Sequence, residues 1–281
     1  MDYSNPEIPE GINTSKQHPL KDFIILTGGV LGGIALCAFL LSLFVEHLAV
    51  YIPFSVEQQI MQNIDIRDAE NSNPEMQNYL DELSSNLLPY IDLPKDITIN
   101  IHYIDEPIEN AYATLAGHIS IYRGLIELLP NENALAMVIA HEIAHIKQRD
   151  PVVAPGRGIV VGLFLTAIAG TSTDRFVSSV ITDTGTITVL GFNRNQERCA
   201  DEIALKAVAA YYGHVNGADT LFKEFLKTEK NINIHTPEFF STHPLSEDRI
   251  TNLHDTALMN GWALDGKTTE LPSLIKFALT D

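Results

Sequence analysis

Residues 136–151 of the chain read AMVIAHEIAHIKQRDP and contain an H-E-x-x-H pattern formed by His141, Glu142 and His145. Residues four apart on a helix share one face, so the two imidazoles point the same way and can bind one zinc ion. Glu142 lies one position on, close enough to reach a metal-bound water as a general base. Because apolar residues flank the pattern, we expect its polar atoms to be mostly buried, where a metal supplies the partners that they need.

We predict that this pattern lies on a helix within a mainly helical α+β domain that contains a small sheet. Asn131 is a suitable N-cap for a helix over 131–148, and Pro151 is a suitable stop. Alternating apolar residues over 97–104 indicate a half-buried strand. The other predicted elements are helices over 74–88, 194–212, 218–230 and 246–259 and short strands over 111–114 and 118–122, joined at Gly117.

A hydrolytic zinc ion needs three protein ligands and one open position, so the third ligand must come from elsewhere in the chain. We predict that it is Glu197, which begins an E-x-x-x-D pattern with Asp201 on a helix. The two carboxylates share a face, so Glu197 can bind the metal while Asp201 accepts the N–H of a zinc-bound imidazole and fixes its tautomer. Cys199 lies about 200° from Glu197 around the helix and is not expected to be a ligand. Without the upstream pattern, the two acids would be interpreted as a solvated helix face.

The composition excludes several classes of protein. With 18 Lys and Arg against 36 Asp and Glu, the formal net charge is 18 − 36 = −18, which argues against nucleic-acid binding because the phosphate backbone would be repelled. A hydrophobic fraction of 45% fits a folded chain rather than a disordered one. Two cysteines can form neither a disulfide scaffold nor a zinc ribbon.

Residues 23–45 read FIILTGGVLGGIALCAFLLSLFV, without a charged residue or a proline. At ~1.5 Å per residue this stretch is long enough to cross ~30 Å of hydrocarbon. A buried core helix would show a polar face, and a cleaved signal peptide would have a shorter apolar stretch before a cleavage site, so we expect an uncleaved anchor. Lys16 and Lys21 precede the span, and the next basic residue is Arg67. The positive-inside rule then predicts a single-pass protein with a cytoplasmic N-terminus and an extracytoplasmic globular domain, on the periplasmic side of an inner membrane if the source is bacterial.

These observations divide the chain into a polar tail over 1–22, the anchor over 23–45, a linker over 46–54 and one globular domain over 55–281. The apolar stretch over 158–170 is too short to span a bilayer. Two interpretations of it stay open: a core helix, or a hydrophobic hairpin that rests against the membrane or covers the site.

Four segments, in order, resemble the HtpX-like, BepA-like and CAAX-prenyl-protease-type zinc metallopeptidases of peptidase family M48. They are NAYATLAGHISIYRGLI, AMVIAHEIAHIKQRDP, RNQERCAD and STHPLSEDRI, and the resemblance covers roughly residues 55 to 255. It implies a gluzincin-type fold and endopeptidase activity, with zinc held by His141, His145 and Glu197 and with Glu142 as the base. The chain departs from the family at 115–117, where it reads Leu-Ala-Gly and a Gly-Gly is usual.

The resemblance also implies roles for His243 and Arg249 near the C-terminus. As oriented donors near the scissile carbonyl, they would stabilise the oxyanion that forms during attack. Alternatively, His243 occupies the fourth zinc position in a resting state. The simpler alternative is that His243 belongs to a helix-entry turn and that Arg249 forms a surface ion pair.

The extended segment before the metal-binding pattern is a candidate edge strand for the substrate. A peptide could pair with its main chain, which favours unfolded or extended substrates over a fixed sequence. The residues assigned to substrate binding on this ground are Asn110, Ala111, Tyr112, Ala113 and Thr114.

We therefore expect a membrane-anchored endopeptidase with one Zn²⁺ per chain, which hydrolyses peptide bonds by Glu-assisted attack of a zinc-bound water. Its expected role is protein quality control, and its expected partners are unfolded or membrane-associated polypeptides and the lipid bilayer. One alternative is a non-catalytic tethered chaperone or assembly factor, but a binding role needs no general base at Glu142. Another is an intramembrane processing protease of the prenyl type, which would need many spans.

Overall fold

The computed structural model describes residues 18–49, 51–62, 73–153, 156, 192–229, 237–244 and 247–272. The apolar stretch over 158–170 and most of the polar tail lie outside these residues. The two interpretations of 158–170 therefore stay predictions.

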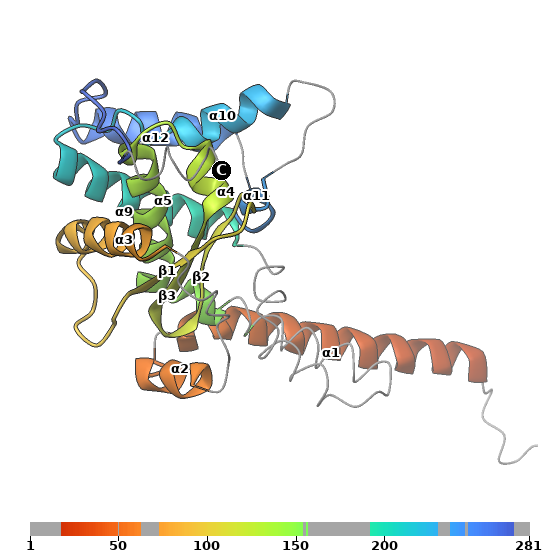
Figure 1. Ribbon diagram of the computed structural model, residues 1–281. Coiled ribbons are helices and arrows are strands. Elements are labelled where there is room, and N and C mark those ends of the chain that lie inside the picture. Colours follow the sequence, from red (N-terminus) through yellow and green to blue (C-terminus); the bar gives the residue numbers. More distant parts are fainter. Residues whose placement is uncertain are drawn as a thin grey trace, which may run out of the picture.

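The N-terminal helix α1 (Pro19–Ala49) contains the predicted anchor and extends beyond both of its ends. At about 1.5 Å per residue its 31 residues reach about 46 Å. Its apolar part, Pro19–Val45, is the one helix of the described residues long and apolar enough to cross a membrane, and none of it is buried against protein. Figure 1 shows α1 running away from the body of the molecule, as a membrane anchor would.

The sheet has three strands in the order β1-β3-β2. Strand β1 (Asn100–Ile104) runs parallel to β3 (His118–Tyr122), and β2 (Ala111–Ala113) pairs with β3 in the antiparallel sense. This order leaves β2 at one edge of the sheet, as predicted for the candidate substrate strand. The sequence predicts the strands but not the parallel pairing, because the register of two strands so far apart depends on tertiary packing.

A short 3₁₀ turn, η2 (Leu115–Gly117), joins β2 to β3. Gly117 has a φ of 76°, and a Cβ there would lie 1.8 Å from the carbonyl oxygen of Thr98, so only glycine fits. Ala116 also has a positive φ, 58°, which is uncommon for a residue with a side chain. The left-handed backbone explains why a glycine pair would suit this turn.

The central helix α5 (Glu132–Lys147) carries the H-E-x-x-H pattern and is almost entirely buried. The Asn131 side chain accepts a hydrogen bond of 3.0 Å from the amide of Ala134, which confirms it as the N-cap. The helix ends at Lys147 with Gln148 as its C-cap, so the predicted end at 148 is confirmed. Pro151 is not what stops it: Arg149 turns the chain with a left-handed φ of 65°, and Pro151 lies in a further helical turn at 150–153.

Helix α9 (Arg194–Tyr212) packs along α5, and α3 (Pro74–Leu87) contacts α5 as well (Figure 1). A capping box formed by Asn193 and Gln196 begins α9, and Gly213 ends it with a φ of 78°. The remaining elements are α2 (Phe54–Met61), η1 (Leu88–Tyr90), α4 (Arg123–Leu128), α10 (Thr220–Glu229), α11 (Phe239–Thr242) and α12 (Glu247–Met259). The predicted fold class, mainly helical α+β with a small sheet, is confirmed.

Candidate active site

The two histidines of the pattern lie on one face of α5, and both are buried. Their Nε2 atoms are 3.0 Å apart. This proximity follows from their spacing, because residues four apart meet on the helix surface.

Glu197 of α9 lies opposite this pair. Its Oε2 is 3.5 Å from Nε2 of His141, and its Oε1 is 3.5 Å from Nε2 of His145. The side-by-side packing of α5 and α9 therefore brings Glu197 to two histidines that lie more than fifty positions earlier in the sequence. This is the arrangement predicted for the third ligand.

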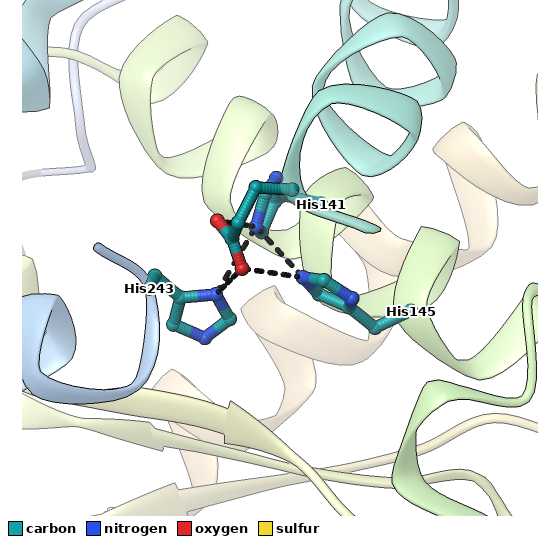
Figure 2. Close-up of side chains that lie close together, drawn as sticks. His141, His145 and His243 are labelled. Atoms are coloured by element: carbon teal, nitrogen blue, oxygen red, sulfur yellow. Dashed lines mark hydrogen bonds and ion pairs between the residues drawn. The ribbon is translucent and has the colours of Figure 1, made fainter. Parts of the chain in front are cut away.

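A fourth donor comes from His243, which directly follows α11 and is fully buried. Its Nδ1 lies 3.0 Å from Oε1 of Glu197 and 3.3 Å from Nε2 of His141. Figure 2 shows the three imidazoles converging on one point. The four donor atoms of His141, His145, Glu197 and His243 all lie within 4.8 Å of one another.

The spacing of these donors fits a tetrahedral metal ion. Ligand atoms about 2.0 Å from a tetrahedral zinc are about 3.3 Å from one another. The separations of donor pairs given above run from 3.0 to 3.5 Å. The buried donors, neutral imidazole and carboxylate, are also of the type that zinc prefers. The residues therefore fit a zinc ion both in geometry and in chemistry.

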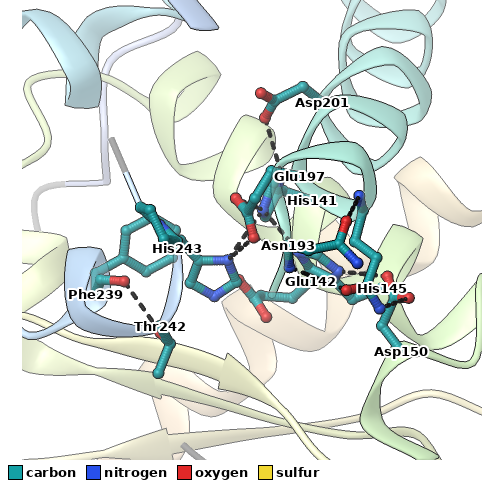
Figure 3. A network of polar contacts seen from close by, with 12 residues as sticks. His141, Glu142, His145, Asp150, Asn193, Glu197, Asp201, Phe239, Thr242 and His243 are labelled. Atoms are coloured by element: carbon teal, nitrogen blue, oxygen red, sulfur yellow. Dashed lines mark hydrogen bonds and ion pairs between the residues drawn. The ribbon is translucent and has the colours of Figure 1, made fainter. Parts of the chain in front are cut away.

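Two acids hold the imidazoles of α5 from behind (Figure 3). Nδ1 of His141 lies 3.0 Å from Oδ1 of Asp201, in the arrangement predicted for that carboxylate. Nδ1 of His145 lies 2.8 Å from Oδ2 of Asp150, which sequence analysis did not identify. Asp150 in turn accepts a hydrogen bond of 2.5 Å from the side chain of Gln196. The sequence offered one signal for this role, an acid five residues after His145. Only the turn at the end of α5, however, brings the carboxylate of Asp150 back to the imidazole.

Arg249 of α12 contacts two of these acids. It forms a two-pronged hydrogen bond with Asp201, of 2.9 and 2.8 Å, and its Nη1 lies 2.7 Å from Oε2 of Glu197. The residue is 5% exposed, so this is not a surface ion pair. These contacts place Arg249 behind the metal-binding atoms, where it holds two carboxylates.

For most side chains of this buried cluster, the electrostatic environment favours the protonation state that binds a metal. Burial lowers the pKa of both His145 and His243, which keeps them neutral. Burial opposes the charge on Glu197, but His243 and His141 outweigh it and hold the pKa of Glu197 well below its usual range. At His141 burial is outweighed by Asp201 and Glu197, which raise its pKa to about 10. A bound metal would have to displace that proton.

Glu142 lies beside the cluster with no exposed surface. Neither of its carboxylate oxygens has a hydrogen-bond partner among the described residues, and Oε1 is 3.3 Å from Nε2 of His243. Burial raises its pKa, against the opposing charge of His141. A buried carboxylate without a partner is costly to a fold. Its position next to a metal-binding cluster is the arrangement expected of a group that acts on a bound molecule.

Strand β2 directs part of its backbone away from β3. The amide of Thr114 donates to His118, and that of Tyr122 donates to Asn110, so these residues form the hydrogen-bonded pairs with β3. In an antiparallel ladder the alternate residues Ala111 and Ala113 then direct their N–H and C=O groups away from β3. Of the five residues assigned to the substrate, these two have the backbone orientation that an added strand needs.

The family model described as Peptidase family M48 matches residues 74–257, more than half of the chain. The chain belongs to peptidase family M48. Every residue of the metal-binding cluster lies inside the matched range. The M48 assignment confirms the resemblance seen in the sequence and identifies a metallopeptidase domain.

Named relatives agree with this assignment. The chain is 29% identical to the mitochondrial metalloendopeptidase OMA1 of Schizosaccharomyces pombe, over 57% of this chain and 47% of the relative. It is 26% identical to the beta-barrel assembly-enhancing protease of Escherichia coli, over 66% of this chain and 40% of the relative. It is 24% identical to a protease HtpX homolog of Aquifex aeolicus, over 89% of this chain and 93% of the relative. The chain thus spans less than half of the first two M48 relatives and nearly all of the third.

Proposed function

We propose that the protein is a membrane-anchored, zinc-dependent endopeptidase. One observation carries the proposal: a buried ring of metal-binding donors at tetrahedral spacing lies directly beside the partnerless carboxylate of Glu142. A chaperone or assembly factor would have no use for a buried acid that costs stability and whose oxygens have no hydrogen-bond partner among the described residues.

In this proposal His141, His145 and Glu197 hold the zinc, and His243 supplies a fourth ligand in a resting state. Nδ1 of His243 faces the ring of donors, which supports this role over that of an oxyanion donor. The zinc would supply Lewis-acid chemistry, which polarises a peptide carbonyl and acidifies water. Asp201 and Asp150 keep His141 and His145 in the required tautomers. Arg249 acts as a positioning residue for Glu197 and Asp201.

Glu142 would move the protons of the reaction. Its carboxylate takes a proton from the attacking water and later returns it to the nitrogen of the leaving amine. Burial favours the protonated form of Glu142, so the acid holds that proton readily between the two steps.

The substrate would be an extended polypeptide that adds a strand to β2. The backbone groups of Ala111 and Ala113 that point away from β3 would offer main-chain hydrogen bonds, which require no particular side chain of the substrate. Unfolded segments meet this requirement and folded domains do not. The name of one relative refers to β-barrel assembly, which supports a role in protein quality control.

The domain division and the orientation are part of the same proposal. The anchor over 23–45 lies within α1, and the peptidase domain follows from residue 55. The lysines that precede the span support an N-terminus in the cytoplasm and a peptidase domain outside it.

Metal analysis of the purified protein beside two variants tests the proposal. We expect about one zinc per wild-type chain and cleavage of casein that a chelator abolishes and added zinc restores. Glu197→Ala should lose both the metal and the activity, because it removes a ligand. Glu202→Ala is the matched control, since Glu202 is an exposed acid on the same helix. Retention of zinc by the Glu197→Ala variant, or cleavage that survives the chelator, would refute the proposal.

A further inference from the structure

Glu57 is a buried acid that lies outside the metal-binding cluster, on the short helix that follows the membrane helix. Its side chain is 4% exposed. The carboxylate forms an ion pair with Nη1 of Arg149, and its other oxygen accepts a hydrogen bond of 2.9 Å from the amide of Ala116. One carboxylate of α2 therefore contacts two separate segments of the peptidase domain.

The first of these segments is the turn that ends α5. Arg149 occupies the position just after the helix cap with a φ of 65°, where helices commonly place glycine. Its guanidinium also donates a hydrogen bond of 2.7 Å to the carbonyl of Ile52. The residue after it is Asp150, whose carboxylate lies 2.8 Å from Nδ1 of His145. The turn that Arg149 makes is thus what returns Asp150 to a metal-binding imidazole.

The second segment is the turn that follows the edge strand. Ala116 has a φ of 58° and comes two residues after Thr114, the last of the residues assigned to the substrate. Among the described residues, the non-glycine residues with a positive φ are Asp92, Ala116 and Arg149, and two of these three contact Glu57. Such conformations persist where the surrounding structure over-determines them, and they cluster at functional sites.

We propose that Glu57 and Arg149 are positioning residues that set the edge strand and the metal-binding imidazole of His145 relative to each other. Because α2 follows α1 after a short connection, this bridge begins at the membrane side of the molecule (Figure 1). A second close approach in the same region supports it: Gly156 lies so near the end of α1 that a Cβ on it would be 2.7 Å from Cγ1 of Val45.

The test uses the full chain in detergent and measures Co²⁺ affinity and the visible spectrum of bound Co²⁺, together with kcat and KM for a peptide. Glu57→Gln removes the charge but keeps an acceptor for Ala116, and Arg149→Gln removes the other partner. Arg149→Lys keeps the positive charge. The matched control is Glu132→Gln, because Glu132 accepts hydrogen bonds from Tyr79 and Tyr212 and joins helices without contacting either turn.

Substitution of a carboxylate that directly supports a metal ligand costs about 10- to 100-fold in affinity. Glu57 and Arg149 act one step further out, so we expect Glu57→Gln and Arg149→Gln to weaken Co²⁺ binding and lower kcat by about three- to tenfold. The Co²⁺ spectrum should shift in both variants. Arg149→Lys should stay within about twofold of wild type, and Glu132→Gln should lower only the melting temperature.

The inference is overturned if both Gln variants lower the melting temperature as Glu132→Gln does while Co²⁺ affinity, spectrum and kcat stay at wild-type values. If Glu57→Gln does not fold, the two Arg149 variants decide the question alone. The measurement of kcat rests on the proposed function. A wild-type chain that cleaves nothing would refute that function, whereas the Co²⁺ measurements would still decide the role of Glu57 and Arg149.

Discussion

The buried side chains of this site differ in whether they have hydrogen-bond partners, and Glu142 differs most from the others. It is fully buried and partnerless among the described residues, while the donors around it contact one another. A residue kept in such a state costs stability and is explained by what it does to a bound molecule.

Glu142→Gln should therefore separate metal binding from turnover. We expect kcat to fall about 10²- to 10⁴-fold, because the amide cannot accept the proton. Zinc content should stay unchanged, since Glu142 is not among the four donors, and the melting temperature should stay equal or rise, since the amide never places a charge in this buried position. Zinc analysis, a peptide cleavage assay and thermal unfolding measure these quantities. A variant within tenfold of wild-type kcat would exclude Glu142 as the base.

At the scale of the elements, a histidine pair in the sheet should make the stability of the fold depend on pH. His118 of β3 and His102 of β1 lie with Nδ1 and Nε2 2.8 Å apart. Burial, with the neighbouring His102, lowers the pKa of His118 to about 4. In the unfolded chain the pKa of histidine is about 6.5, so between these values the unfolded state binds more protons. The free energy of unfolding should thus fall as the pH drops from about 6.5 to about 4.

His118→Asn removes this titration. At pH 5 we expect the wild type to have lost about 1–2 kcal/mol relative to pH 7 from this residue, a loss that the variant should not show. Thermal unfolding of both proteins with a chelator present, so that metal release does not contribute, measures the difference. An equal loss in the two proteins would contradict the assignment.

At the scale of the whole molecule, the described residues join an exposed apolar helix to a buried metal-binding cluster, and the two cysteines of the chain can report on the orientation in the membrane. Cys37 lies in α1 and Cys199 lies on α9 in the peptidase domain, and both are free thiols. Burial raises the pKa of Cys199, so its thiolate is scarce at neutral pH.

A Cys37→Ser variant should be labelled at Cys199 by a membrane-impermeant maleimide added outside intact cells, if the peptidase domain is extracytoplasmic. We expect faster labelling at about pH 9 than at neutral pH, because the thiolate is the reactive form. Mass spectrometry of the purified protein measures the modification. Labelling that requires permeabilised membranes would reverse the proposed orientation.

Sequence patterns alone determined the parts of this protein that depend on neighbours along the chain. The facing imidazoles of His141 and His145, the N-cap at Asn131 and the long apolar helix all follow from residue type and spacing within one element. Glu197 and Asp201 were predicted on the same ground, as acids on one helix face, with the metal chemistry supplying the reason to look for them.

Only the tertiary structure decided which distant residues meet. The placement of Asp150 behind His145, of Arg249 against two carboxylates and of Glu57 between two left-handed turns depends on how α2, α5, α9 and α12 pack. No periodicity encodes these contacts, because each side chain reaches across elements whose relative position is set by burial of the common core. A polar group buried by that packing must then find its partner wherever the fold has placed one.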